Sequence, residues 1–230
     1  MTRTVGALLL LLLSYAPLAA ADRVSVLELF TSQGCSSCPA ADKLLGELAG
    51  RDGVLALSMP VDYWDYIGWK DTLASPAFSA RQRAYAKARG DRAVYTPQLV
   101  FNGLVHTVGS NRTAISEALK KTNARRHSVA VELQERGGEI VAEIGAGPRM
   151  RASVILVVYE PSATVSIKRG ENAGKTITYH NVVRRIVPLG DWNGAAETYT
   201  AKAPAGVRCA VIVQAGTQSA PGEILGAAAL

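Results

Sequence analysis

The sequence predicts two parts: an α/β domain with the element order β-α-β-α-β-β-α over residues 22–125, and a β-rich, sandwich-like domain over residues 126–230. In the first part, short apolar runs alternate with stretches in which apolar residues recur every three or four positions, the spacing of one helix face. Beyond residue 125, every second residue is apolar instead, as at Val129, Val131 and Leu133. This alternation is typical of strands. The change of pattern favours two domains.

The N-terminal residues have the pattern of a signal peptide. Arg3 is followed by an apolar run over residues 5–13 and by alanines at 19–21, which is typical of an export signal and its cleavage site. The apolar run is shorter than the roughly 20 residues that a membrane-spanning helix needs. We therefore expect residues 1–21 to be removed and the mature protein to have no transmembrane segment. Its expected location is periplasmic or secreted, where disulfides persist.

In the first part, capping and turn residues mark where elements begin and end. Ser75 and Pro76 are suited to begin a helix, and Gly90 is suited to end it. Asn102-Gly103 is the strongest two-residue signal for a β-hairpin. The expected strands cover residues 24–30, 54–59, 98–101 and 104–108, and the expected helices cover residues 39–49, residues 76–89 and a stretch after Asn111.

The second part has strand patterns and no helical spacing. Gly137-Gly138 supplies a turn between its first two strands, and joints rich in glycine and proline separate the later ones. The expected strands cover residues 129–133, 140–144, 154–159, 176–187 and 207–213.

Composition and charge argue against two broad classes of protein. The formal net charge is +6, and no block of Lys and Arg or basic-aromatic stripe occurs. A nucleic-acid partner is therefore not expected. Hydrophobic residues make up 48% of the chain, which argues against disorder.

Three cysteines are too few for a disulfide scaffold. Cys35 and Cys38 form a C-x-x-C pair between the first expected strand and the first expected helix. Cys209 alternates with valines in the last expected strand, so we expect a buried free thiol that packs as a small apolar side chain. No second C-x-x-C exists and the histidines are scattered, which does not fit a closed zinc site of four ligands. We expect neither a metal nor another cofactor.

A cysteine pair at the junction of a strand and a helix is suited to thiol-disulfide exchange. The unpaired N–H groups and the positive dipole end at the start of a helix favour a thiolate. We expect Cys35 to be the attacking sulfur and Cys38, one turn further in and more shielded, to resolve the mixed disulfide. An inert structural disulfide and a metal site stay open as alternatives.

The order strand, turn, C-x-x-C and helix, with Thr96-Pro97 directly before a later strand, resembles that of thioredoxin-fold proteins. The resemblance implies that Pro97 follows a cis peptide bond and lies beside the cysteines. It also implies that the backbone of Thr96 pairs with an extended substrate. Gly34 stands where ordinary thioredoxins have tryptophan, so reduction potential and partner choice do not carry over. The alternative is that Pro97 only begins a strand.

More narrowly, several stretches are similar to a secreted thioredoxin-like family known only as domain of unknown function 1223. No established reaction comes with that family, so the similarity implies the fold and not the function. The stretches are residues 30–39, 61–70, 95–98, 170–174 and 179–181.

Two polar features are further candidates for the site. Glu28 lies in the otherwise apolar strand before the cysteines. If it is buried, its pKa rises and it can take the proton from Cys38 during resolution; the alternative is a strand with one solvated face. His180 and the loop over residues 170–174 reach the site from the second part, or the loop is a hairpin turn with an incidental histidine.

An aromatic stretch over residues 62–69 is a candidate for substrate binding. Trp64 and Trp69 are suited to form the wall of a groove, with Asp62 or Asp65 as polar contacts. Thr96 and Pro97 complete the expected substrate-binding set. The alternative is that the aromatic side chains only pack.

The function that these observations favour is an exported thiol-disulfide oxidoreductase that acts through Cys35 and Cys38. Its expected partners are protein or small-molecule thiols and disulfides, including a redox partner. One alternative is a copper-binding chaperone that uses both thiolates and His106 or His180, since thiolates suit cuprous copper. Another is a non-catalytic interaction protein on a thioredoxin-like scaffold, in which the disulfide only staples a turn.

Overall fold

The computed structural model of the protein describes residues 24–123, 127–203 and 205–230. The predicted signal peptide, residues 1–21, lies outside the described residues. Within the described ranges, no helix is long and apolar enough to cross a membrane.

The elements of the first part occur in the predicted order β-α-β-α-β-β-α. As predicted, Ser75 caps the second helix, because its Oγ accepts a hydrogen bond from the backbone N–H of Ala77. Gly90 ends that helix with a φ of 76°, a conformation that glycine adopts freely. The elements are β1 (Ser25–Thr31), α1 (Pro39–Ala49), β2 (Val54–Pro60), the short 3-10 helix η1 (Asp65–Ile67), α2 (Pro76–Arg89), β3 (Gln98–Phe101), β4 (Val105–Val108) and α3 (Arg112–Asn123).

The described elements of the second part are all strands. The strands are β5 (Val131–Arg136), β6 (Glu139–Ile144), β7 (Ala152–Ser166), β8 (Thr176–Trp192), β9 (Glu197–Lys202), β10 (Arg208–Thr217) and β11 (Ala220–Ala229). β7 extends beyond the predicted range 154–159 into a ribbon of exposed and half-buried residues that its apolar run does not mark. β8 starts at residue 176 as predicted but continues past residue 187 to Trp192, which pairs with Ala152 at the start of β7.

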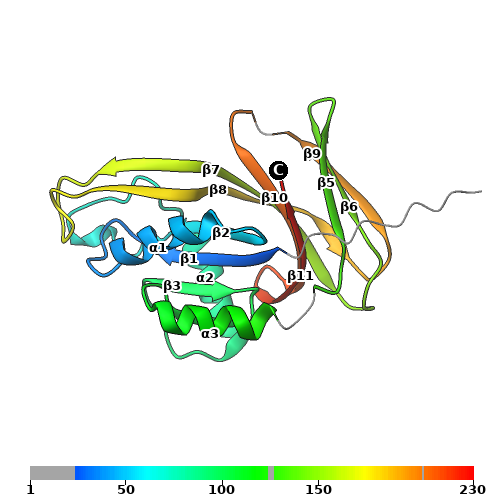
Figure 1. The fold of residues 1–230 in the computed structure, drawn as a ribbon, viewed down its shortest axis with the longest axis horizontal. Coiled ribbons are helices and arrows are strands. Elements are labelled where there is room, and N and C mark those ends of the chain that lie inside the picture. The colour runs from blue at the N-terminus through cyan, green and yellow to red at the C-terminus, as the bar shows by residue number, and fades with distance from the viewer. Residues whose placement is uncertain (1–23, 124–126, 204) are drawn as a thin grey trace, which may run out of the picture.

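Strands from both parts form one mixed sheet in the order β11-β10-β7-β8-β2-β1-β3-β4 (Figure 1). The link is made where β2 and β8 run parallel, with Ser58 opposite Val182. The side chain of Asn181 strengthens it by donating to the carbonyl of Ala56 at 2.9 Å. The division between residues 125 and 126 stays a prediction about folding units, but the hydrogen-bonded sheet is continuous between the two parts.

A separate antiparallel sheet in the order β5-β6-β9 packs against the end of the large sheet formed by the second part (Figure 1). The apolar core between them includes Ile140 from the small sheet, Val154 and Val211 from the large one, and Trp192. Two sheets packed face to face account for the sandwich-like pattern of the second half.

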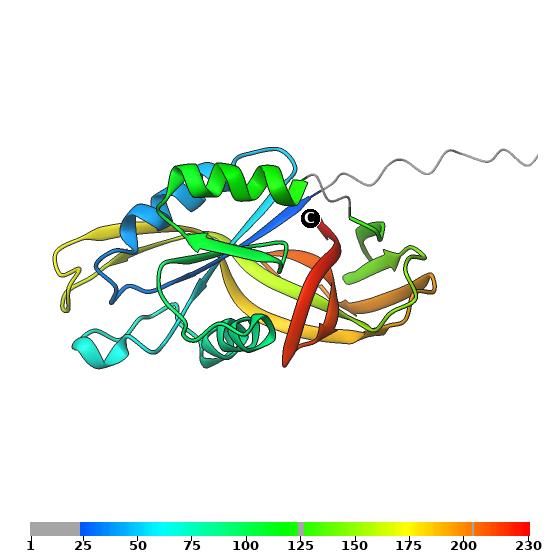
Figure 2. The ribbon, with the colours of Figure 1, turned by 90° about the horizontal axis from the view of Figure 1, so that it is seen from below.

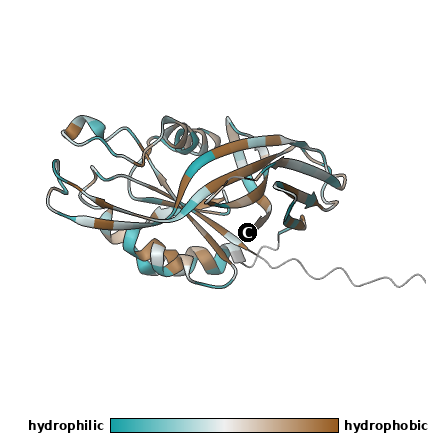
Figure 3. Cartoon of the chain, turned by 90° about the horizontal axis from the view of Figure 1, so that it is seen from above, coloured by the Kyte–Doolittle hydropathy of each residue, from teal (hydrophilic) through white to brown (hydrophobic). Residues whose placement is uncertain are grey.

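Helices cover both faces of the large sheet (Figure 2). Leu27 and Leu29 of β1 pack towards α1 and α3. Phe30 lies on the other face in the same cluster as Phe78 of α2. All seven residues of β1 are buried, so the alternative of one solvated face for this strand is wrong. Figure 3 shows the hydrophobic residues gathered along the strands, whereas the helices alternate between hydrophobic and hydrophilic positions.

Candidate active site

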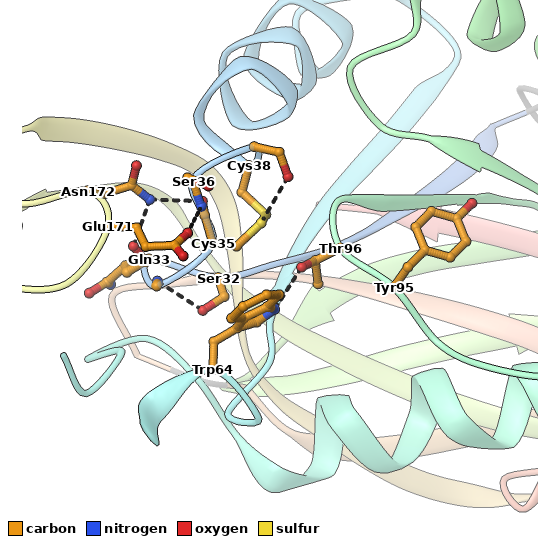
Figure 4. Close-up of a disulfide and its surroundings, with 12 residues drawn as sticks. Ser32, Gln33, Cys35, Ser36, Cys38, Trp64, Tyr95, Thr96, Glu171 and Asn172 are labelled. Atoms are coloured by element: carbon orange, nitrogen blue, oxygen red, sulfur yellow. Dashed lines mark hydrogen bonds between the residues drawn. A yellow bond between two sulfur atoms is a disulfide. The ribbon is translucent and has the colours of Figure 1, made fainter. Parts of the chain in front are cut away.

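The two cysteines are joined by a disulfide where the chain passes from β1 into α1, with their Cα atoms 5.4 Å apart (Figure 4). Cys38 is the N-cap residue of α1, and its carbonyl accepts from the backbone N–H groups of Ala41 and Asp42. Ser37 Oγ lies 3.3 Å from Cys35 Sγ. Cys35 is 2% exposed and Cys38 0%. Both cysteines are therefore buried, and Cys35 is the more exposed of the two.

Glycine precedes Cys35 because the space for a larger side chain is taken. A Cβ at Gly34 would lie 3.1 Å from Trp64 Cβ and 3.1 Å from Ile67 Cδ1, closer than most such contacts. The tryptophan that ordinary thioredoxins carry at this position cannot be accommodated here without displacing these neighbours. Trp64 and Ile67 instead cover this side of the cysteine turn from the aromatic segment.

The structure brings Trp64 and Thr96 together beside the disulfide. The indole N–H of Trp64 donates to Thr96 Oγ1 at 2.8 Å (Figure 4), and the peptide bond between Thr96 and Pro97 is cis. Tyr66, which is 80% exposed, stacks on Trp64 with 6.3 Å between ring centroids. The aromatic segment thus presents an exposed ring next to the candidate site.

Trp69 has a different position from Trp64. Its indole N–H donates to Gln33 Oε1 at 2.7 Å, and the backbone N–H of Gln33 donates to Asp71 Oδ2 at 2.8 Å. Gln33 is fully buried and lies two residues before Cys35. Trp69 therefore stabilises the cysteine turn indirectly, through its hydrogen bond to Gln33.

The two aspartates predicted as polar contacts for substrate are engaged within the fold. Asp62 accepts from Ser79 Oγ of α2, and Asp65 accepts from the backbone N–H of Asp71. Both carboxylates thus order the segment between β2 and α2.

A hairpin tip from the second part contacts the cysteine turn, as one of the two interpretations of residues 170–174 predicted. The Nδ2 of buried Asn172 donates to the carbonyls of Gln33 at 2.9 Å and Cys35 at 2.8 Å. Glu171 Oε2 accepts from the backbone N–H of Ser36 at 3.1 Å. Figure 4 shows both side chains reaching over from the β7–β8 hairpin. Neither residue was singled out from the sequence, although residues 170–174 and the cysteine motif belong to the same family resemblance.

His180 lies away from the hairpin tip that contacts the cysteine turn. It lies against α1, where a Cβ on Gly46 would be 2.5 Å from its Cδ2. With Lys43 and other residues it lines a shallow surface pocket beside that helix. Its close fit with Gly46 indicates a packing role between β8 and α1.

Glu28 is fully buried and paired. Its carboxylate accepts from Arg81 Nε at 2.6 Å and Nη2 at 3.2 Å, and also from the hydroxyl of Tyr85. Burial acts to lower the pKa of Arg81, but Glu28 and Tyr85 together raise it above its ordinary value. Since Leu27 and Leu29 face α1, Glu28 lies on the opposite, α2 side of β1. Proton transfer by Glu28 stays a prediction without support from these contacts.

A second buried carboxyl, Asp42 of α1, was not predicted. It is 2% exposed, and burial raises its pKa to about 8, with nearby Asp71 adding to the rise and the Thr31 hydroxyl opposing it. An acidic residue in the first turn of a helix is usually explained by the helix dipole. The available signal was its position next to the apolar stripe formed by Ala41, Leu45 and Leu48.

The histidines are engaged away from the cysteines. His106 Nε2 lies 3.4 Å from Asp91 Oδ2, and its Nδ1 is 2.8 Å from the hydroxyl of Tyr95. His127 bonds to backbone carbonyls. Within residues 24–123, 127–203 and 205–230, no group of three or more His, Cys, Asp or Glu side chains is placed to hold a metal, so the copper alternative gains no support. Cys209 is free and buried, as predicted.

Residues 26–214 match the family described as Protein of unknown function (DUF1223). The chain belongs to this family. The crystal structure of protein AGR_C_4864 from Agrobacterium tumefaciens is similar to this DUF1223 protein, with a TM-score of 0.81 and 35% identity, and the match covers 92% of this chain and 96% of that one. Coverage on this scale includes both the mixed sheet and the separate antiparallel sheet.

A shorter similarity involves a protein named Probable Thioredoxin from Archaeoglobus fulgidus. It is 43% identical over 37 residues, which is 16% of this DUF1223 chain and 41% of the archaeal protein. The chain thus spans less than half of that relative.

Proposed function

We propose that this protein is an exported thiol-disulfide oxidoreductase whose first part has a thioredoxin-like fold. The observation that carries the proposal is the Cys35–Cys38 disulfide at the start of α1, with Thr96 beside it (Figure 4). The partial similarity to a probable thioredoxin supports the same chemistry. The predicted signal peptide supports a periplasmic or secreted location, where such a pair finds oxidising partners.

The exchange needs only the two sulfurs and a partner. A substrate thiolate attacks Cys35 Sγ, the Cys35–Cys38 bond breaks, and Cys38 leaves as a thiolate that takes up a proton. A second substrate thiolate then attacks the substrate sulfur of the mixed disulfide and releases Cys35. The protein gains two electrons and the substrate loses two. The reverse sequence reduces a substrate disulfide, with Cys35 attacking and Cys38 resolving.

Cys35 is suited to be the sulfur that meets the partner. It precedes the first turn of α1, where the helix dipole favours negative charge, and Ser37 Oγ at 3.3 Å can donate a hydrogen bond to its thiolate. Trp64, Thr96 and Pro97 are the proposed substrate-binding residues, and exposed Tyr66 extends this surface. Trp69 contributes indirectly through Gln33.

The second part supports the site through the β7–β8 hairpin. Asn172 bridges the carbonyls of Gln33 and Cys35, which fixes the turn on both sides of Gly34. We assign the hairpin the role of holding the turn in one conformation. Preorganisation of this kind reduces the cost of reaching the reactive geometry.

A mass measurement with a small disulfide tests the proposal. In a Cys209→Ala background, reduced Cys38→Ser protein is mixed with oxidised glutathione, and the expected product is a stable adduct of one glutathione on Cys35. The matched Cys35→Ser protein is expected to react at least tenfold more slowly, because the remaining thiol is the shielded one. Equal reactivity of the two variants, or none in either while the protein stays folded, would contradict the proposed function.

A further inference from the structure

Asp42 lies one helical turn after Cys38 on α1. The backbone N–H of Asp42 donates to the Cys38 carbonyl at 3.0 Å, which is the i to i+4 relation of a helix. Side chains in this relation share one helix face, with their Cβ atoms about 5–6 Å apart. The side chains of Asp42 and Cys38 therefore lie on the same face of α1, one helical turn apart.

The surroundings of Asp42 offer little to stabilise a negative charge. Neither carboxyl oxygen has a hydrogen-bond partner within the described residues, and the same is true of the hydroxyls of Thr31 and Tyr179. Two groups affect its pKa besides burial: Thr31 from β1, which lowers it, and Asp71 from the segment after η1, which raises it. Asp42 in turn raises the pKa of Tyr179 from β8. None of the groups that act on the pKa of Asp42 is a cation. An unpaired buried carboxylate is costly, so the carboxyl retains its proton at neutral pH.

Asp71 in the same cluster is satisfied, which distinguishes it from Asp42. Its two oxygens accept from the backbone N–H groups of Gln33 and Leu73, each at 2.8 Å. Its carboxylate is thus committed to the cysteine turn, and its negative charge raises the pKa of Asp42 further.

We propose that Asp42 exchanges a proton with Cys38 as the disulfide opens and closes, an inference that rests on the proposed function. When a substrate thiolate attacks Cys35 Sγ, the bond to Cys38 breaks and the departing Cys38 thiolate receives the proton of the Asp42 carboxylic acid. The products are the mixed disulfide, the Cys38 thiol and the Asp42 carboxylate. On closing, the carboxylate takes the proton back, Cys38 attacks Cys35 Sγ, and the substrate leaves as a thiolate.

The energetic balance of this transfer is favourable. The pKa of Asp42, raised to about 8 by burial, is close to the value of about 8.5 of an ordinary thiol. A proton therefore passes between the two groups with little cost in either direction. Glu28, by contrast, is ion-paired with Arg81 on the other side of β1.

The pH dependence follows from the protonation of Asp42. Below about pH 8 the carboxyl carries the proton that Cys38 needs on opening, and above that pH the donor is progressively lost. The opening rate per molecule of attacking thiolate is therefore expected to fall as the pH rises through this value. Asp42→Asn has no such proton, so its rate at pH 7 should drop by about tenfold or more and lose this inflection.

The rate at which the disulfide opens, and its pH dependence, are measured by stopped-flow reduction with a small thiol between pH 6 and pH 10. The protein used is the full chain with Cys209→Ala. Glu47→Gln, an exposed carboxyl on the same helix, is the matched control and should behave as the parent. A parental rate and pH profile in Asp42→Asn would overturn the inference while leaving exchange itself intact. Failure of the parent to be reduced at all would instead count against the proposed function.

A measurement on the unmutated carboxyl keeps the inference testable if Asp42→Asn does not fold. Carbon-13 NMR of the side-chain carboxyls, assigned through the backbone, should show Asp42 protonated at pH 7 in the oxidised protein and its shift should change on reduction. An Asp42 signal that titrates with an ordinary pKa near 4 would overturn the inference.

Discussion

Two buried carboxyl groups lie on opposite sides of the first strands and have opposite surroundings. Glu28, on the α2 side, is matched by Arg81 and Tyr85, and Gln214 of β10 joins the network by accepting from Arg81 Nη2 at 2.9 Å. The carboxyl oxygens of Asp42, on the α1 side, have no hydrogen-bond partner within the described chain. The paired carboxyl is a fixed charge that ties β1, α2 and β10 together, whereas the unpaired one is free to gain and lose a proton.

Breaking the paired side should have the largest effect on stability. Arg81→Met removes the cation at similar volume and leaves Glu28 buried without its partner, which typically costs about 3–5 kcal/mol. Denaturant unfolding measures the loss. The double variant Glu28→Gln/Arg81→Met should recover most of it, because no charge is then left unpaired. Arg112→Met, which removes an exposed ion pair with Glu47, is the matched control and should leave stability unchanged. Equal losses of stability in Arg81→Met and Arg112→Met would show that the buried ion pair of Glu28 matters no more than an exposed one.

The unpaired side should respond to pH. The pKa of Asp42 is raised in the folded protein to about 8 from an ordinary value of 3.8. Between these values the folded state binds the proton more tightly than the unfolded state, so its contribution to stability falls as pH rises. Asp42→Asn removes this dependence, and we expect its stability relative to the parent to increase by roughly 4 kcal/mol between pH 5 and pH 9.

Denaturant unfolding of the parent and the variant at both pH values provides that comparison. A stability difference that does not vary with pH would show that the Asp42 carboxyl is already ionised in the folded protein at pH 5. The unpaired carboxyl would then not differ from the paired one.

The contact between the hairpin and the cysteine turn should have a smaller effect. Asn172→Ala removes donors from the carbonyls of Gln33 and Cys35 and should destabilise the protein by about 1–3 kcal/mol. Asn193→Ala, which removes a hydrogen bond within an exposed loop, is the control. Amide hydrogen exchange of residues 33–38 should rise only in the first variant. If amide exchange of residues 33–38 is unchanged in Asn172→Ala, the hairpin does not hold the cysteine turn in one conformation.

The sequence predicted the first part well because its signals are local. The cap at Ser75, the turn at Asn102-Gly103 and the position of the C-x-x-C pair each depend on a few neighbouring residues. The join between β2 and β8 could not be predicted, because it rests on Ser58 and Val182, which are far apart in the chain.

The same distinction applies to the site. Cys35 and Cys38 have a recognisable spacing, whereas Asn172 contacts Cys35 across 137 positions of sequence. Glu28 and Asp42 each looked ambiguous, since a carboxyl in an apolar strand or in a first helical turn has several uses. What separates their roles is the presence of Arg81 beside Glu28 and the lack of a hydrogen-bond partner for the Asp42 carboxyl among the described residues. Which side chains surround a carboxyl group depends on the tertiary structure and cannot be seen in the local sequence.

The central claim is that Cys35 is held as a reactive thiolate at the start of α1, and the pH dependence of its alkylation tests this most directly. In the reduced Cys209→Ala protein, the rate of reaction of Cys35 with iodoacetamide is followed by mass spectrometry from pH 4 to pH 10. The account predicts that the rate reaches half its maximum well below pH 8.5, the ordinary pKa of a thiol. A midpoint at or above pH 8.5 would contradict it.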